Sequence, residues 1–143
     1  MNFNNFTIKS QEAVQEAVNL VQSRGQQAIE PEHLMAGLLK VGENVTNFIF
    51  QKLGINGQQI ETVLDRQIAS LPKVSGGEAY LSRSANEVLQ KALEVSKELG
   101  DEYVSLEALL LALLNVKSTV ATILKDAGLT DKELRAAIQE LRQ

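Results

Sequence analysis

The sequence predicts an all-α domain of eight helices, built from two copies of one four-helix unit. Two observations support this fold class. Apolar residues recur at the three- and four-residue spacing of a helix along the whole 143-residue chain, and no stretch shows the two-residue alternation of a half-buried strand. The chain also matches itself at an offset of about 75 residues, which indicates one supersecondary unit used twice. We therefore expect two copies related by a pseudo-twofold axis, and no β-sheet.

The self-match covers most of both copies. Equivalent positions in the first part are Thr7 and Ser82, Glu12 and Glu87, Ala17 and Ala92, Gly25 and Gly100, Glu32 and Glu107, and Leu38–Leu39 and Leu113–Leu114. After a one-residue deletion the match resumes with Ile49 and Ile123, Gly54 and Gly128, and Ile60 and Leu134. We expect one domain over residues 1–143, with repeat one at 6–71, a surface linker at 72–80 and repeat two at 81–143.

Four helices are expected in the first copy. Thr7 is a suitable N-cap because its hydroxyl can accept an amide hydrogen of the first turn, and Gly25 is a typical helix stop. The second helix begins at Pro31, whose missing N–H would have no partner in a first turn anyway. A third helix is expected from about residue 44 to 53, and a fourth ends before Pro72.

The second copy repeats this scheme. Ser82 is expected to cap the fifth helix, Ser105 the sixth and Ser118 the seventh. Thr130 begins the eighth helix, where Glu133 completes the pattern of a capping box. Four repeat-matched leucines lie on the inner stripes of their helices and are expected in the core: Leu38, Leu39, Leu113 and Leu114.

The composition is that of an ordinary globular protein, with 44% hydrophobic and 22% charged residues. A formal net charge of -4 and scattered basic residues disfavour nucleic-acid binding, which needs a clustered basic face. No apolar stretch is long enough to span a membrane, and the first ten residues lack the blocks of a signal peptide. The absence of cysteine suits a reducing cytosol, so we expect a cytoplasmic protein with no membrane contact.

Chemistry-bearing motifs are missing from the sequence. There is no GxxxxGK[ST] phosphate loop, and a single histidine without cysteine argues against a metal cage. His33 is expected to be a partly solvated residue in the first turn of its helix. Thr7 and Ser82 are explained as caps, and a nucleophile would need a base and an orienting group beside it. We expect no catalytic site, no metal and no cofactor in this chain.

The helix expected at residues 106–114 is more apolar than packing on one face requires. A one-sided helix needs three or four apolar residues per two turns, whereas this segment holds six leucines and two alanines. Two interpretations stay open. The helix is central and buried on all sides, or part of its surface, with the Leu93 side of the preceding helix, lines an open apolar groove for a partner.

Acidic residues lie close to this apolar segment. A carboxylate in a first helical turn interacts favourably with the helix dipole, which by itself would explain Glu107 and its repeat mate Glu32. Alternatively, each glutamate receives a cationic group or backbone amides from a bound chain. Asp101 has no acidic mate, because Gln26 occupies the equivalent position. The two copies are therefore not expected to bind identically.

Two long strings resemble the double Clp repeat that forms the N-terminal domain of Clp-family ATPases. They are FTIKSQEAVQEAVNLVQSRGQQAIEPEHLMAGLL in the first copy and YLSRSANEVLQKALEVSKELGDEYVSLEALLLALL in the second. The resemblance covers nearly the whole chain. Together with LPKVSGG and ATILKDAGL, these strings are more similar to the ClpB type, the protein disaggregases, than to the ClpA or ClpC types.

This resemblance implies a substrate-binding module that captures unfolded or aggregated polypeptide in an apolar groove. It also implies a hexameric ATPase ring as partner, whose ATPase modules, with their ATP and Mg, are not in this chain; the isolated domain is expected to be monomeric. Thr7, Asp101 and Glu107 match polar family positions linked to substrate handling. The apolar candidates for the groove are Leu89, Leu93, Leu109 and Leu110.

A second hypothesis is the adaptor- or degron-binding N-domain of a ClpC-like unfoldase. In that case Glu32 and Glu107 would read a modified arginine. Two equivalent sites, one in each copy, would favour degron binding. One apolar groove with Asp101 beside it would favour unfolded chain.

Overall fold

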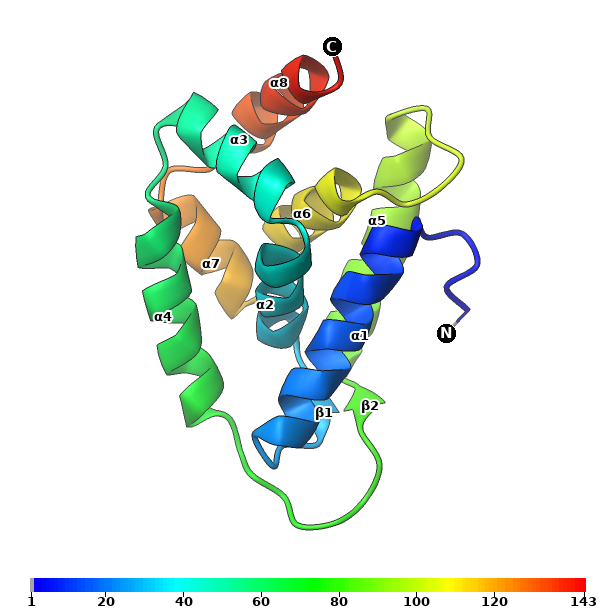
Figure 1. The fold of residues 1–143 in the computed structure, drawn as a ribbon, viewed down its shortest axis with the longest axis vertical. Coiled ribbons are helices and arrows are strands. Elements are labelled where there is room, and N and C mark those ends of the chain that lie inside the picture. The colour runs from blue at the N-terminus through cyan, green and yellow to red at the C-terminus, as the bar shows by residue number, and fades with distance from the viewer. Residues whose placement is uncertain (1) are drawn as a thin grey trace.

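Eight helices enclose an apolar core in the computed structural model, which describes residues 2–143 (Figure 1). The elements in chain order are α1 (Ile8–Ser23), β1 (Ala28–Ile29), α2 (Pro31–Val41), α3 (Glu43–Leu53), α4 (Gly57–Ser70), β2 (Tyr80–Leu81), α5 (Arg83–Glu98), α6 (Leu106–Asn115), α7 (Thr119–Asp126) and α8 (Asp131–Leu141). The predicted all-α class with eight helices is confirmed.

The expected helix caps form, and they do so alike in the two copies. The Thr7 hydroxyl accepts the Ser10 amide hydrogen at the start of α1, and the Ser82 hydroxyl accepts that of Ala85 at the start of α5. After these helices, Gly25 and Gly100 adopt φ of +66° and +75°, a region that favours glycine. At α8 the capping box is only half formed, because the Glu133 carboxylate accepts the Thr130 hydroxyl rather than a backbone amide.

The expectation of no sheet is wrong. β1 and β2 pair in parallel, with Ile29 opposite Leu81, and a single bridge of the same kind joins Phe6 to Val104. Segments of two residues are too short to show an alternating pattern, and their partners lie far away in the sequence. The two pairings are equivalent under the self-match, since each joins the residue before an N-cap of one copy to the loop of the other.

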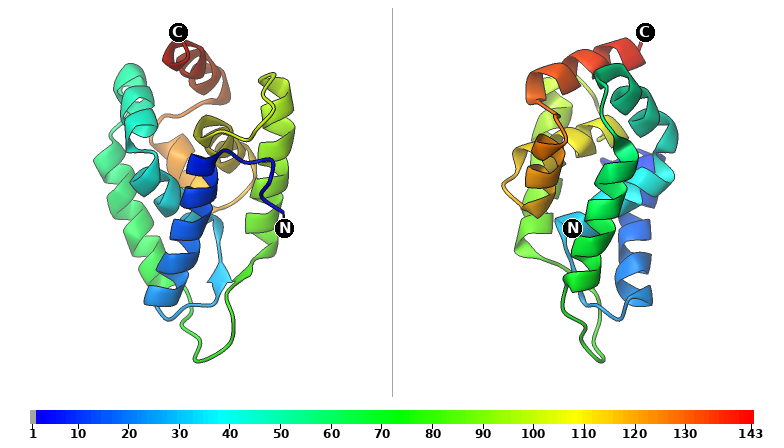
Figure 2. Two further views of the ribbon diagram at one scale, coloured as in Figure 1. Left: turned by 45° about the vertical axis from the view of Figure 1, so that its right-hand side comes forward. Right: turned by 90° about the vertical axis from the view of Figure 1, so that its left-hand side faces the viewer.

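The two copies are also interlocked through their helices. α1 packs against α2 and α5 against α6, within each copy, and α2 meets α6 at the centre. The later helices pack across the copies, α3 against α8 and α4 against α7 (Figures 1 and 2). The third and fourth helices of each copy therefore bury part of their surface against the other copy. The repeat boundaries at 6–71 and 81–143 stay a prediction, which superposing the two halves would test.

α6 occupies the centre of the molecule. Every residue from Leu106 to Leu114 except Glu107 is buried, because α1, α2, α5, α7 and α8 all contact this helix. The interpretation of a central helix is therefore the right one. Within residues 2–143 no single helix is long and apolar enough to cross a membrane, and the consecutive α6 and α7, which pass that test together, are bent by 98° at the break between them.

His33 is fully buried, which corrects the expectation of a partly solvated side chain. Its Nδ1 accepts the Glu30 amide hydrogen at 2.9 Å, so Nε2 carries the ring hydrogen and donates to Gln26 Oε1 at 2.7 Å. Gln26 in turn donates to the carbonyl oxygen of Ile68 at the end of α4, at 2.7 Å. Position in a first turn does not show what lies over a side chain, and here Gln26 bonds the ring and links it to the end of α4.

Leu39 is the one predicted core leucine that is only half-buried, whereas its repeat mate Leu114 is 1% exposed. Leu114→Ala should lower the free energy of unfolding by about 2–5 kcal/mol, because it leaves a cavity. Leu39→Ala should cost roughly 1–2 kcal/mol, because part of that side chain is already in water. Urea unfolding of both variants measures the difference, and equal losses would contradict the burial of this pair.

Burial of His33, with the nearby Arg24 charge, lowers its pKa to about 4. Between pH 6.5 and 4 the imidazole of His33 is protonated in the unfolded chain but stays neutral in the folded state. The free energy of unfolding is therefore unaffected by this residue above pH 6.5 and falls by roughly 3 kcal/mol as the pH is lowered to about 4. His33→Gln keeps a usual capping-box residue at this position and should flatten the fall. Urea unfolding at stepped pH tests this, and an unchanged slope in the variant would refute it.

Candidate functional site

The polar residues singled out in the sequence meet at one corner, where the start of α1 meets the turn between α5 and α6. The Thr7 amide donates to the carbonyl oxygen of Val104 at 3.0 Å, which places Thr7 beside Ser105, the N-cap of α6. Asp101 begins the same turn, and Glu107 stands in the first turn of α6. We call this region the seam corner and define it by Thr7, Asp101, Ser105, Glu107 and Arg142.

Arg142, just after α8, binds the two carboxylates together. It donates to both oxygens of Asp101, from Nη1 at 3.0 Å and from Nη2 at 2.7 Å. Its Nε donates to Glu107 Oε2 at 3.1 Å, and Nη2 also reaches the Ser105 hydroxyl at 3.3 Å. These hydrogen bonds, that to Asp101 first, raise the pKa of the guanidinium above its ordinary value. The pairs are only partly buried, with 29% of the Arg142 side chain and 22% of the Asp101 side chain exposed.

Sequence reasoning missed Arg142, although the repeat held a clue to it. The self-match aligns Asp101 with Gln26 and Arg142 with Ile68. In the first copy Gln26 binds the backbone of Ile68, and in the second copy Asp101 binds the side chain of Arg142. The turn after the first helix thus contacts the end of the fourth helix in both copies, and only the chemistry of the contact differs.

The apolar candidates do not line an open groove. Leu89, Leu109 and Leu110 are each 0% exposed, and Leu93 is half-buried against the core. Helical periodicity shows which residues share a face, but not whether another helix covers that face, and here the neighbours of α6 cover all of it. The expected groove of exposed leucines is therefore absent from the described residues.

Other apolar side chains are exposed beside the corner. Ile8, the first residue of α1, is 76% exposed, and Tyr103, between Asp101 and the bridge at Val104, is 48% exposed. Ile8 follows Thr7 and Tyr103 precedes Val104, and the hydrogen bond between the Thr7 amide and the Val104 carbonyl oxygen holds the backbone beside both residues. The sequence signal for them was weak, because a single apolar residue at a helix start or in a turn breaks no pattern.

The equivalent region of the first copy is closed. Gln26 and Glu32 are only 7% and 6% exposed, and His33 fills the space beside Gln26. Burial raises the pKa of the Glu32 carboxyl, whereas Glu107 has a guanidinium partner. Two equivalent carboxylate sites, as degron binding would need, are therefore not what the structure presents. Among residues 2–143, no group of three or more His, Cys, Asp or Glu side chains is placed to hold a metal ion.

Comparisons with known proteins agree with this geometry. The sequence pattern of the Clp repeat (R) N-terminal domain matches residues 5–141. The chaperone protein ClpB of Bacteroides thetaiotaomicron is 79% identical over 143 residues, and that of Porphyromonas gingivalis is 51% identical over the same length. In both cases the match covers 100% of this chain and 17% of the relative, so the chain spans about a sixth of the length of these relatives.

Solved structures show the same fold. The N-terminal domain of Hsp104 from Candida albicans superposes with a TM-score of 0.84 at 23% identity, covering 97% of this chain and 92% of that one. The ClpV N-domain in complex with a VipB peptide gives a TM-score of 0.76 at 19% identity, covering 92% of this chain and 83% of that one.

Proposed function

The chain belongs to the Clp repeat N-terminal domain family, and we propose that it captures unfolded or aggregated polypeptide for an ATP-dependent disaggregating chaperone. The identity to ClpB chaperones over the whole chain supports this function. The proposed partners are client polypeptides and the remainder of a hexameric ATPase ring. The interaction of a ClpV N-domain with a peptide adds support, because it is a peptide complex of a domain with this fold.

The seam corner is the observation that carries the proposal. An unfolded chain offers backbone amides, basic side chains and loose apolar side chains in succession. The corner presents the carboxylates of Asp101 and Glu107, and the exposed Ile8 and Tyr103 adjoin the backbone pairing of Thr7 with Val104 in the same region. Burying about 300 Å² of apolar surface yields several kcal/mol before the losses from ordering. Capture is then weak and reversible, which suits a module that must pass its client on.

The Arg142 guanidinium occupies the place that a cationic group of a client would take. It satisfies both carboxylates when no client is bound, so no buried charge is left alone. Arg142 is bidentate on Asp101 and shared with Glu107, so these pairs are worth more than the about 0–1 kcal/mol of an isolated surface ion pair. A lysine or an arginine of the client can replace Arg142 where its own charge-assisted hydrogen bonds to the carboxylates offset that loss. The degron-binding alternative lacks this support, because Glu32 is buried and, among residues 2–143, has no arginine partner that a bound cation could replace.

The remaining features follow from the same proposal. This chain itself catalyses no reaction and takes no nucleotide, because hydrolysis belongs to the ATPase modules of the ring. The isolated domain is monomeric, and the protein works in the cytoplasm. These statements rest on the likeness to ClpB chaperones and on the site chemistry described above.

Neutralising the corner should weaken client binding without unfolding the domain. Asp101→Asn and Glu107→Gln should each raise the dissociation constant of a permanently unfolded model protein by about fivefold, or roughly 1 kcal/mol, and shift Tm by only a few degrees. Fluorescence titration measures the binding. Glu102→Gln is the matched control, since Glu102 is an exposed neighbour in the same turn, and it should bind like the wild type.

Arg142→Gln gives the opposite test. It frees both carboxylates, so the same client should bind more tightly than it does to the wild type. If the Asp101 and Glu107 variants both bind normally, these side chains serve only to hold the end of α8, and the corner is not the capture site.

Nucleotide should have no effect on the isolated domain. We expect no heat signal and no change of Tm on titration with ATP and Mg at millimolar concentration, because the chain has no phosphate loop. Saturable binding in isothermal titration calorimetry would overturn this expectation and reveal a site of another kind.

A further inference from the structure

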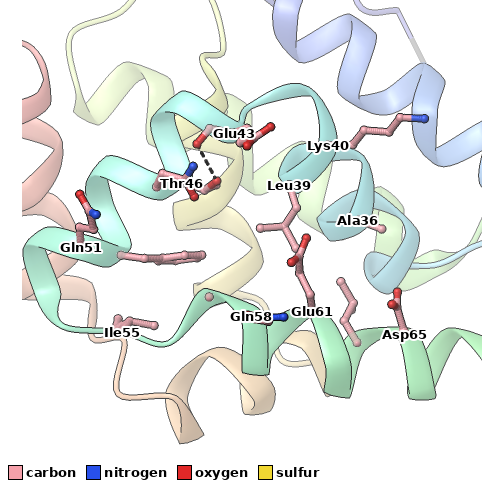
Figure 3. A pocket seen from close by; sticks show the side chains of 14 residues that line it. Ala36, Leu39, Lys40, Glu43, Thr46, Gln51, Ile55, Gln58, Glu61 and Asp65 are labelled. Carbon is pink, nitrogen blue, oxygen red and sulfur yellow. Dashed lines mark hydrogen bonds between the residues drawn. The ribbon is translucent and has the colours of Figure 1, made fainter.

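A groove of about 720 Å³ lies between α2, α3 and α4, on a part of the molecule that shares no residue with the seam corner. Figure 3 shows its lining. We call it the α2–α4 groove. Apolar side chains of Leu39, Phe50, Ile55 and Leu64 line it, and polar side chains from all three helices surround them.

The rim of this groove carries carboxylates without cationic partners. Glu43, Glu61 and Asp65 are exposed, and within residues 2–143 none of them forms an ion pair. Figure 3 shows Glu61 and Asp65 projecting from α4 toward α2. The one cation among the lining residues, Lys40, is held by Glu16 of α1 at 3.1 Å. The groove therefore presents a negative rim, and of its four named apolar residues Leu39 is half-buried whereas Phe50, Ile55 and Leu64 are no more than 8% exposed.

The fold does not require this charge. The self-match aligns Glu61 with Arg135 and Gln58 with Lys132, so the same positions on α8 are basic. Arg135 is paired there with Asp131 and Glu98. The helix dipole favours Glu43, which lies in the first turn of α3, but it does not explain Glu61 or Asp65, because its effect is confined to the first turn and both lie beyond the first turn of α4. The acidic rim is a feature of the first copy alone.

We propose that the α2–α4 groove binds an extended polypeptide segment in which basic and apolar residues alternate. Glu61 and Asp65 are four residues apart on one helix face, so their Cβ atoms lie about 5–6 Å from each other. Alternate side chains of an extended chain are roughly 6–7 Å apart on one side, which matches this spacing. Two basic side chains then meet the carboxylates, while the intervening apolar side chain turns toward Leu39 and Phe50.

This inference rests on the proposed function, because the segment is part of a client, but it names a different surface. Unfolded chains would contact the domain at two places. At the seam corner, groups of a client displace Arg142 with little preference for sequence. The α2–α4 groove instead prefers segments in which basic residues stand next to apolar ones. The net charge of -4 favours approach of the same segments.

The test uses the whole 143-residue chain and two fluorescent peptides. One alternates lysine with leucine and phenylalanine, and the other has glutamate in place of each lysine. The lysine peptide should bind, more weakly as salt rises, and the glutamate peptide should not. The double variant Glu61→Gln/Asp65→Asn should weaken the lysine peptide by about tenfold. A matched double variant, Glu102→Gln/Asp126→Asn, removes two exposed carboxylates outside the groove and should bind like the wild type.

Chemical-shift mapping locates the bound peptide. Shifts at Leu39, Phe50 and Ile55 support the proposal, whereas shifts confined to Ile8 and Tyr103 overturn it. Unchanged affinity in the groove double variant also overturns it. If that variant instead abolishes a concentration-dependent self-association of the wild type, the groove binds a second copy and the proposal is wrong.

Failure of the proposed function gives a different result. Suppose that the Asp101 variant binds the unfolded model protein more weakly, while the groove double variant binds the lysine peptide as well as the wild type does. The proposed function is then supported, and only the proposal for the groove is wrong. If neither the unfolded protein nor the lysine peptide binds the wild type, the function itself fails.

Discussion

Two reciprocal backbone pairings hold the molecule together, and the rest of the structure depends on them. The Thr7 amide donates to the carbonyl oxygen of Val104, and the Ser82 amide donates to that of Ile29, each at 3.0 Å. Each pairing begins a helix of one copy on a loop of the other. Because α3 packs on α8 and α4 on α7, the later helices cross between copies as well. The two repeats therefore form one core, and neither is a separate folding unit.

The same pairings place the residues of the candidate site. Fixing Thr7 beside the turn before α6 brings Asp101, Ser105 and Glu107 within reach of Arg142 at the end of α8. In the first copy Gln26, in the corresponding turn, is buried and donates to the carbonyl oxygen of Ile68 at the end of α4. A charge at Gln26 would be costly there, since it would lose its hydration, so a neutral amide and a neutral His33 complete the contact. The two copies share the same order of helices, but the Gln26 region of the first copy is buried whereas the Asp101 region of the second is partly exposed.

The open surfaces share a physical character. Both combine carboxylates with apolar side chains that water can still reach, and neither holds a cage of buried polar groups. Contacts of this kind depend on salt, exchange quickly and tolerate many sequences. They suit the proposed capture of diverse, unstructured chains for a short time. The buried polar network of Gln26, His33 and the Glu30 amide is, by contrast, shielded from water and fully hydrogen-bonded. It fixes the turn that leads into α2.

The sequence by itself determined what is local or repeated. Caps such as Thr7 and Ser82, the helix order and the internal duplication follow from neighbours a few residues apart, and the resemblance to Clp repeats followed from the same strings. Only the tertiary structure decided burial and long-range partners. It closed α6 on every side, buried His33, paired strands of two residues and brought Arg142 to Asp101. Those outcomes depend on which helix covers which face, and no periodicity along a single helix records that.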